Sequence, residues 1–187
     1  MMTTLRSATA AEHAQLEEAV AIQRRFRSPA TYCELLEAFY GFVRPLEDEL
    51  AVHDWARVGL NFDQRRKVSL LEKDLAIAGS APEDLEQCDS LPDVSSIDRA
   101  FGALYVMEGS TLGGQHIAKL AGAAKIDPDA LHYFRSYGLG VGEMWKSFGD
   151  ALNRFAEKCG DAPEIINGAQ ETFSLLRSWF LRQLTHS

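Results

Sequence analysis

Apolar residues recur along the chain at three- and four-residue steps, and this spacing predicts a succession of helices. In the first segment Leu5, Thr9, His13, Leu16 and Val20 fall on one helical face, so a helix is expected over residues 3–24. Period-two alternation, which indicates strands, is rare. The pattern therefore predicts an all-α protein.

Local start and stop signals divide the chain that follows. Ser28 is suited to cap a helix and Pro29 to begin one, which predicts a second helix over 29–53, kinked or split by Pro45. A third helix is expected over 63–79, because glycine at its end is a common C-terminal stop.

The segment 79–95 is polar, acidic and interrupted by two prolines, and is expected to be a loop. Ser95 or Ser96 can then cap a long helix over 97–121. The remaining pattern predicts a short helical turn over 127–134, irregular backbone over the glycine-rich 137–142, and helices over 143–159 and 163–185.

Three glycines interrupt the apolar pattern of the long helix. Gly109, Gly113 and Gly114 fall within about one and a half turns, and each costs roughly 1 kcal/mol relative to alanine inside a helix. Two explanations stay open from the residues alone. Small residues four apart allow close packing of two helices, whereas side chains missing over one turn leave a slot for a flat ligand.

The first helix offers a partner for such a slot. His13 should point inward, although a single inward histidine is usually a hydrogen-bonded core residue. Arg6 lies two turns earlier, about 10 Å away at the rise of a helix. The pair suits a disc whose centre is bound by His13 and whose anionic edge reaches Arg6, although an arginine near a helix start is as often a surface residue.

Composition narrows the class of protein. The 187 residues are 46% hydrophobic and 25% charged, which is typical of one globular domain over 1–187. We expect a cytoplasmic protein, since neither a membrane span nor a signal peptide is visible. The net charge of −8 argues against nucleic-acid binding. The three widely spaced cysteines suggest neither a disulfide framework nor a zinc cluster.

Motifs of several other chemistries are missing from the sequence. The Cys-x-x-Cys-His attachment of c-type haem, the Glu-x-x-His repeats of di-iron bundles and the His-Glu-x-x-His of zinc proteases do not occur. Phosphate-binding loops and the Gly-x-Ser-x-Gly of hydrolases are missing too.

Two segments resemble a known family, the bacterial biliverdin-producing haem oxygenases, especially those that accompany bacteriophytochromes. They are Leu5-Arg6-Ser7-Ala8-Thr9-x-x-x-His13-x-x-Leu16-Glu17 and Tyr105-Val106-Met107-Glu108-Gly109-Ser110-Thr111-Leu112-Gly113-Gly114. The order of helices is similar over nearly the whole chain. The resemblance implies a single-domain multi-helix bundle that holds haem b between the first helix and a kinked, glycine-rich distal helix.

The resemblance also implies roles for particular residues. His13 is the axial ligand of the haem iron, Arg6 and Tyr105 contact the propionates, Lys146 is a further propionate partner, and Gly109, Ser110 and Gly113 shape the oxygen side. Mammalian-type members carry an aspartate that organises water where this chain has Ser110. Backbone carbonyls of the distal helix are therefore the expected water anchors.

The implied reaction opens haem to biliverdin with O2 and releases CO and ferrous iron. The chain has no flavin or nicotinamide fingerprint, so electrons are expected from a ferredoxin, a flavodoxin or a similar reductase. A bacteriophytochrome is a candidate acceptor of the biliverdin.

Two other functions stay open. The first is a haem carrier or haem sensor that keeps His13 but does not turn haem over. The second is a helical enzyme of the same architecture acting on another small molecule, such as a thiamin- or quinone-related compound. Neither Cys33, Cys88 nor Cys159 has sequence neighbours that would activate a thiol for such chemistry.

Overall fold

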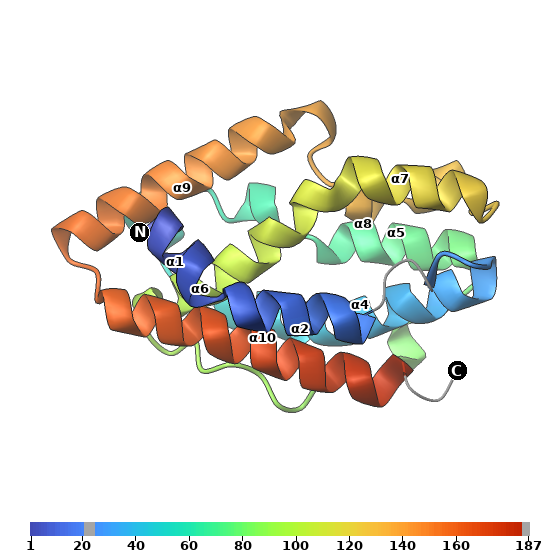
Figure 1. Cartoon of the computed structure of the whole chain (residues 1–187), viewed down its shortest axis with the longest axis horizontal. Helices are drawn as coiled ribbons and strands as arrows, with labels where there is room; N and C mark the ends of the chain where they lie inside the picture. Colours follow the sequence, from blue (N-terminus) through green and yellow to red (C-terminus); the bar gives the residue numbers. More distant parts are fainter. Residues whose placement is uncertain (21–24, 185–187) are drawn as a thin grey trace.

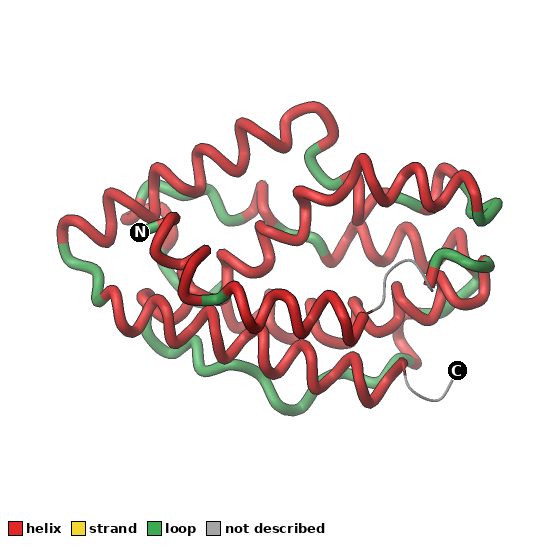
Figure 2. Tube along the Cα trace, in the orientation of Figure 1, coloured by secondary structure: helices red, strands yellow, loops and turns green. Residues whose placement is uncertain are grey.

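The computed structural model describes residues 1–20 and 25–184, and within these ranges the chain forms helices and loops without a strand (Figure 2). This confirms the predicted all-α class. No helix in the described ranges is long and apolar enough to cross a membrane. The helices are α1 (Met2–Ala8), α2 (Ala10–Val20), α4 (Pro29–Leu50), α5 (Val68–Ala78), α6 (Ile97–Gly109), α7 (Gly114–Ala123), α8 (His132–Arg135), α9 (Val141–Lys158) and α10 (Ala162–Leu184).

Short 3₁₀ helices occupy several of the connections. They are η1 (Trp55–Val58), η2 (Asp63–Arg65), η3 (Pro82–Asp84), η4 (Ser110–Gly113), η5 (Pro128–Ala130) and η6 (Gly138–Gly140). The long α10 runs beside α2 and also contacts α6 and α4, while α5 packs on α4 and α8 (Figure 1). The amphipathic α9 contacts α1 and α6 (Figure 1).

Glycines allow α6 and α10 to pack closely against each other. A Cβ atom added to Gly102 would lie 2.2 Å from the carbonyl oxygen of Ile165, and one added to Gly168 would lie 2.3 Å from that of Arg99. Both positions therefore require glycine for packing. The sequence left open whether Gly109 and Gly113 allow two helices to pack closely. In the structure Gly102 and Gly168 have that role.

The first predicted helix is broken rather than continuous. Thr9, with φ of −111° and ψ of 8°, separates α1 from α2. Its hydroxyl donates to the carbonyl oxygen of Leu5 at 2.8 Å, which satisfies one of the last acceptors of α1. The prediction of one helix over 3–24 was wrong at this point, and its last residues, 21–24, lie outside the described ranges.

Helix α4 shows which local signals sufficed. Ser28 accepts a hydrogen bond from the Thr31 amide in a capping box, as the start signal predicted. The helix is not split at Pro45 but continues to Leu50, stopping three residues short of the predicted end. Buried apolar residues on both sides of Pro45, among them Val43 and Leu46, hold the helix together across the proline.

The glycine-rich helix is interrupted where the glycines predicted. Helix α6 ends at Gly109, η4 covers Ser110–Gly113, and α7 begins at Gly114, so the expected helix over 97–121 consists of three pieces. Gly79 ends α5 with a φ of +83°, as predicted. That helix begins only at Val68, since Asp63–Arg65 form η2 instead.

Candidate functional site

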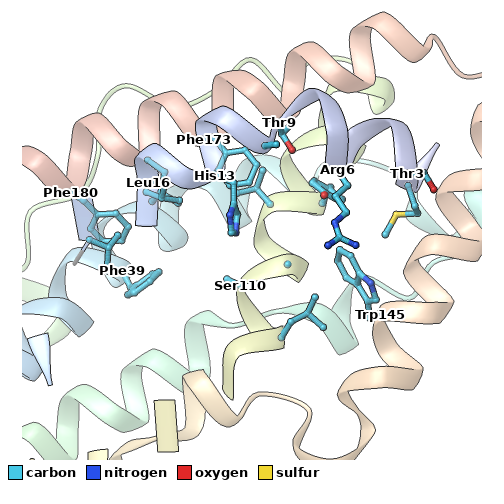
Figure 3. Close-up of a pocket in the computed structure, with 18 residues that line it drawn as sticks. Thr3, Arg6, Thr9, His13, Leu16, Phe39, Ser110, Trp145, Phe173 and Phe180 are labelled. Atoms are coloured by element: carbon cyan, nitrogen blue, oxygen red, sulfur yellow. The ribbon is translucent and has the colours of Figure 1, made fainter. Parts of the chain in front are cut away.

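A cavity of about 730 Å³ lies between the N-terminal helices and the break after α6 (Figure 3). Its size is within the range of small-molecule sites. It is lined by Met2, Thr3, Arg6, Thr9, Ala10, His13, Leu16, Val20, Phe39, Tyr105, Val106, Gly109, Ser110, Leu112, Trp145, Phe173, Leu176 and Phe180. Five of the seven residues singled out in the sequence, His13, Arg6, Tyr105, Gly109 and Ser110, are thus brought to one cavity.

The His13 imidazole points from α2 into this cavity (Figure 3). Its side chain is 57% exposed, so it is not a core histidine. The ring meets Phe173 of α10 edge-on, and Nδ1 lies 3.7 Å from a carboxylate oxygen of Glu17. These two neighbours orient an imidazole that remains accessible from the cavity.

Gly109 and Ser110 line the cavity from the broken helix. A Cβ atom placed on Gly109 would meet no atom of the described residues within 4 Å, and the same is true of Gly113. Neither glycine is therefore needed for helix packing, unlike Gly102. The structure favours the slot over close packing for Gly109, which faces the cavity, whereas Gly113 is not among the lining residues.

Two hydroxyl groups hold the backbone at the break. Ser110 Oγ donates to the carbonyl oxygen of Met107 at 2.7 Å, and Thr111 Oγ1 donates to that of Glu108, also at 2.7 Å. The last carbonyls of a helix lack partners within the helix, so these bonds stabilise the end of α6. The Ser110 hydroxyl also lowers the pKa of the neighbouring Tyr133, against the larger effect of burial, which raises it.

One end of the cavity is cationic and polar. Arg6 points toward Trp145 (Figure 3). The ring centroid of Trp145 lies 5.7 Å from that of Tyr105. Burial raises the pKa of Tyr105, while a hydrogen bond with Thr9 and the charge of Arg6 act in the opposite direction. The phenol is therefore protonated at neutral pH and can donate a hydrogen bond.

The opposite end of the cavity is apolar. Leu16, Phe39 and Phe180 lie there, away from Arg6 (Figure 3). A cavity with one apolar end, one cationic end and an imidazole between them suits a flat apolar ligand that carries acidic groups along one edge.

Lys146 is not brought to this site. Its side chain is 77% exposed, and Nζ lies 2.7 Å from a carboxylate oxygen of Asp150, one turn further along α9. The preceding residue, Trp145, faces the cavity instead.

Sequence reasoning missed most of the apolar lining. Phe39 comes from α4, Trp145 from α9, and Phe173, Leu176 and Phe180 from α10. Each belongs to the ordinary apolar face of its helix, so nothing in its local sequence distinguishes a cavity wall from the core.

A family model described as "Heme oxygenase" matches residues 1–182 of the chain. The chain belongs to the haem oxygenase family. Haem is the substrate of this family, and haem oxygenase is the function that this membership supports.

Curated relatives agree with this assignment. A haem oxygenase of Xanthomonas campestris is 32% identical over 150 residues, which is 77% of this chain and 85% of the relative. The haem oxygenase PigA of Pseudomonas aeruginosa is 30% identical over 164 residues, which is 87% of this chain and 82% of the relative. These comparisons confirm the family that the two sequence motifs indicated.

Solved structures of haem oxygenases share the fold. The NO- and CO-bound enzyme of Neisseria meningitidis superposes with a TM-score of 0.83 at 21% identity, covering 97% of this chain and 90% of that one. The enzyme of Leptospira interrogans gives a TM-score of 0.74 at 20% identity, covering 96% and 98%. The predicted haem-oxygenase-like helical architecture is therefore confirmed.

The residues of the cavity fit haem. The imidazole of His13 points into the cavity from α2 and can bind an iron atom. The space beside Gly109 is open to a flat ring and would be filled by any larger side chain. Arg6 and Tyr105 form a polar end that can bind two carboxylates. The fit rests on the shape of the cavity and on the chemistry of its donors.

Proposed function

We propose that this chain oxidatively opens haem b to biliverdin, with release of CO and ferrous iron, using O2 and externally supplied electrons. The observation that carries the proposal is the cavity itself. It presents one imidazole, from His13, on the α2 side and a helix turn without a side chain, at Gly109, on the other.

His13 is the proposed axial ligand of the haem iron. The carboxylate of Glu17, near Nδ1, favours the tautomer with a proton on that nitrogen, which leaves Nε2 as the ligand atom. Phe173 limits rotation of the ring through its edge-on contact. Ligation by one nitrogen leaves the opposite face of the haem open.

Arg6 and Tyr105 are the proposed partners of the haem propionates. Arginine keeps its charge at every physiological pH and can bind a carboxylate through two parallel hydrogen bonds. Tyr105 stays protonated, because burial raises its pKa, and it can donate to the same edge. The cationic end is a local exception in a chain with a net charge of −8.

The proposed oxygen side is formed by Gly109 and Ser110, the two of the three expected residues that line the cavity. Bound haem supplies both the iron that activates dioxygen and the ring that is oxidised. The backbone at Gly109 can approach the haem closely, which constrains the space above it. The Ser110 hydroxyl donates a hydrogen bond to the carbonyl oxygen of Met107, and its oxygen keeps lone pairs that can accept a hydrogen bond from ordered water.

The electron donor and the product acceptor belong to the same proposal. We infer a ferredoxin, a flavodoxin or a similar reductase as donor, because the sequence has no flavin or nicotinamide motif. A bacteriophytochrome is the proposed acceptor of biliverdin, on the basis of the sequence resemblance. The free thiols of Cys33, Cys88 and Cys159 support a reducing compartment, the cytoplasm.

The test is an anaerobic titration with hemin, followed by reductant and air, with the pigment identified by chromatography. We expect saturable binding and a green, ring-opened product. A stable oxygenated complex without ring opening would instead indicate a haem carrier or sensor. Failure to bind hemin would favour a helical enzyme for another small molecule.

A further inference from the structure

Four polar side chains meet behind the break between α6 and η4, and none of them lines the cavity. We call Arg65, Lys67, Glu108 and Tyr137 the Glu108 cluster. Glu108 is 1% exposed and Arg65 and Lys67 are each 3% exposed. Arg65 Nη1 donates to Glu108 Oε2, Tyr137 donates to Oε1 at 2.6 Å, and Lys67 Nζ lies 3.6 Å from Oε1. Both oxygens of the buried carboxylate are thus occupied.

The carboxylate stands at an unfavourable place on its helix. Glu108 is the last residue but one of α6, where the helix dipole disfavours a negative charge, and its burial removes stabilisation by water. Arg65 and Lys67 offset both effects. Without Arg65 the end of α6 should therefore loosen first, and the next residues along the chain, Gly109 and Ser110, line the cavity.

The same guanidinium also holds a second wall of the cavity. Arg65 Nη1 and Nη2 each lie 3.3 Å from the carbonyl oxygen of Met144, and Nη2 donates to Ser147 Oγ at 2.8 Å. These two residues flank the turn of α9 that carries Trp145, which faces the cavity. One side chain therefore links the Gly109–Ser110 turn to the Trp145 turn.

The loop that supplies Tyr137 is strained. Ser136 has a φ of +38° and a ψ of −105°, which is rare for a residue other than glycine. Its buried hydroxyl finds no hydrogen-bond partner in the described part of the chain. Tyr137, the next residue, places its ring 3.8 Å from Lys67 Nζ and its hydroxyl on Glu108. Such strain persists only where the surroundings determine the geometry strongly.

Arg99 provides a natural comparison at the other end of α6. It also pairs with carboxylates, those of Glu164 and Glu171 on α10, and its side chain is 16% exposed. These ion pairs join α6 to α10, and none of their residues lines the cavity. A purely structural ion pair on α6 should therefore behave as Arg99 does.

We propose that Arg65 is a positioning residue for the oxidation of haem. Through Glu108 and Ser147 it fixes the separation between the Gly109–Ser110 turn and the Trp145 turn, and so determines how the substrate is seated beneath the oxygen side. This inference rests on the proposed function for its catalytic consequence, whereas its structural part can be tested without haem.

The first test is hydrogen exchange in the ligand-free protein, read by mass spectrometry. In Arg65→Met we expect amides of residues 107–113 and 143–149 to exchange at least about tenfold faster, with the other helices unchanged. In Arg99→Met the same two segments should stay within about twofold of the original protein. Equal acceleration in both variants, or no local acceleration in Arg65→Met, would overturn the proposal.

The second test separates seating from binding. In Arg65→Met we expect kcat for haem opening to fall about tenfold, while Kd for hemin stays within about threefold, because His13 and Arg6 are untouched. Ser147→Ala keeps the buried ion pair and should lower kcat about threefold, so it decides the matter if Arg65→Met does not fold. An unchanged kcat in Arg65→Met, an unchanged kcat in Ser147→Ala if Arg65→Met does not fold, or an equal fall in Arg99→Met would overturn the proposal. If the original protein does not open haem, the proposed function fails, and the exchange result still decides whether Arg65 holds the two turns.

Discussion

The imidazole of His13 meets the ring of Phe173 edge-on, with the ring centroids 5.7 Å apart and the planes at 85°. Phe173 is 4% exposed and fixed within α10, so its ring is a firm support for a histidine that is itself accessible. The contact holds the imidazole directed into the cavity without burying it. This relationship is the basis of the first prediction.

Replacing His13 by alanine should remove the haem ligand and leave the fold intact. We expect hemin to bind at least about tenfold more weakly in His13→Ala, with the spectrum of nitrogen ligation lost and partly restored by added imidazole. The free energy of unfolding should change by less than about 0.5 kcal/mol, because the side chain is largely exposed. His116→Ala, an exposed histidine on α7, is the control. Unchanged ligation in His13→Ala would refute the assignment.

Arg6 and Lys146 should differ in their effect on haem binding. Arg6 lines the cavity, whereas Lys146 is held at the surface by Asp150. Loss of a charge-assisted hydrogen bond in Arg6→Ala should weaken hemin binding about tenfold, and Lys146→Ala should stay within about twofold. Fluorescence titration of both variants checks this. Equal losses would mean that Lys146 leaves Asp150 to reach the propionates.

Two glycines of α6 should respond in opposite ways to alanine. In Gly109→Ala the new methyl group enters open space, so the ligand-free protein should gain up to about 1 kcal/mol of stability while hemin binding weakens. In Gly102→Ala the methyl group would collide with the backbone of α10, which should cost about 1–3 kcal/mol or more. Denaturant unfolding and hemin titration measure both effects. A destabilised Gly109→Ala would mean that this glycine serves packing.

The stability of the protein should depend on Lys67 at alkaline pH. Burial lowers the pKa of Lys67 to about 8, partly opposed by Glu108, and Arg65 lowers it further. Glu47 also faces this lysine, and the pKa of the adjacent Tyr137 is raised, so Tyr137 keeps its proton in this pH range. Between pH 8 and the ordinary value of 10.5 the unfolded chain binds the proton and the folded chain does not. The contribution of Lys67 to the free energy of unfolding therefore rises with pH in that window.

A comparison with Lys67→Met isolates this effect. The free energy of unfolding of the original protein minus that of Lys67→Met should increase above pH 8, by at most about 1.4 kcal/mol per pH unit. Below pH 8 the difference should be constant. Urea unfolding from pH 7 to 10 provides the measurement, and a difference that stays flat or falls above pH 8 would contradict the lowered pKa.

Local signals in the sequence were enough for most of the helices. Ser28 with Pro29 and the terminal Gly79 were correctly assigned, because capping is a property of a few adjacent residues. The break at Thr9 was missed, because the apolar spacing passes through it without interruption. The sequence left open whether Pro45 kinks or splits the second helix, since the buried contacts that hold α4 together across the proline come from other helices.

The candidate site could be predicted only in part, because only some of its residues carry a signal in their local sequence. His13 and Gly109 each violate a local expectation, one as a polar residue on an apolar face and the other as a helix breaker in an apolar helix. The Glu108 cluster was not found, because Arg65 and Tyr137 are far from Glu108 along the chain. One signal was present, namely a carboxylate inside the apolar run that precedes Gly109.

The central claim is that haem lies between His13 and the Gly109–Ser110 turn. A crystal structure of the hemin complex tests it most directly. We predict that Nε2 of His13 binds the iron, that the other face of the ring lies against Gly109 and Ser110, and that the propionates reach Arg6 and Tyr105. Hemin bound outside this cavity, or held through a residue other than His13, would contradict the account.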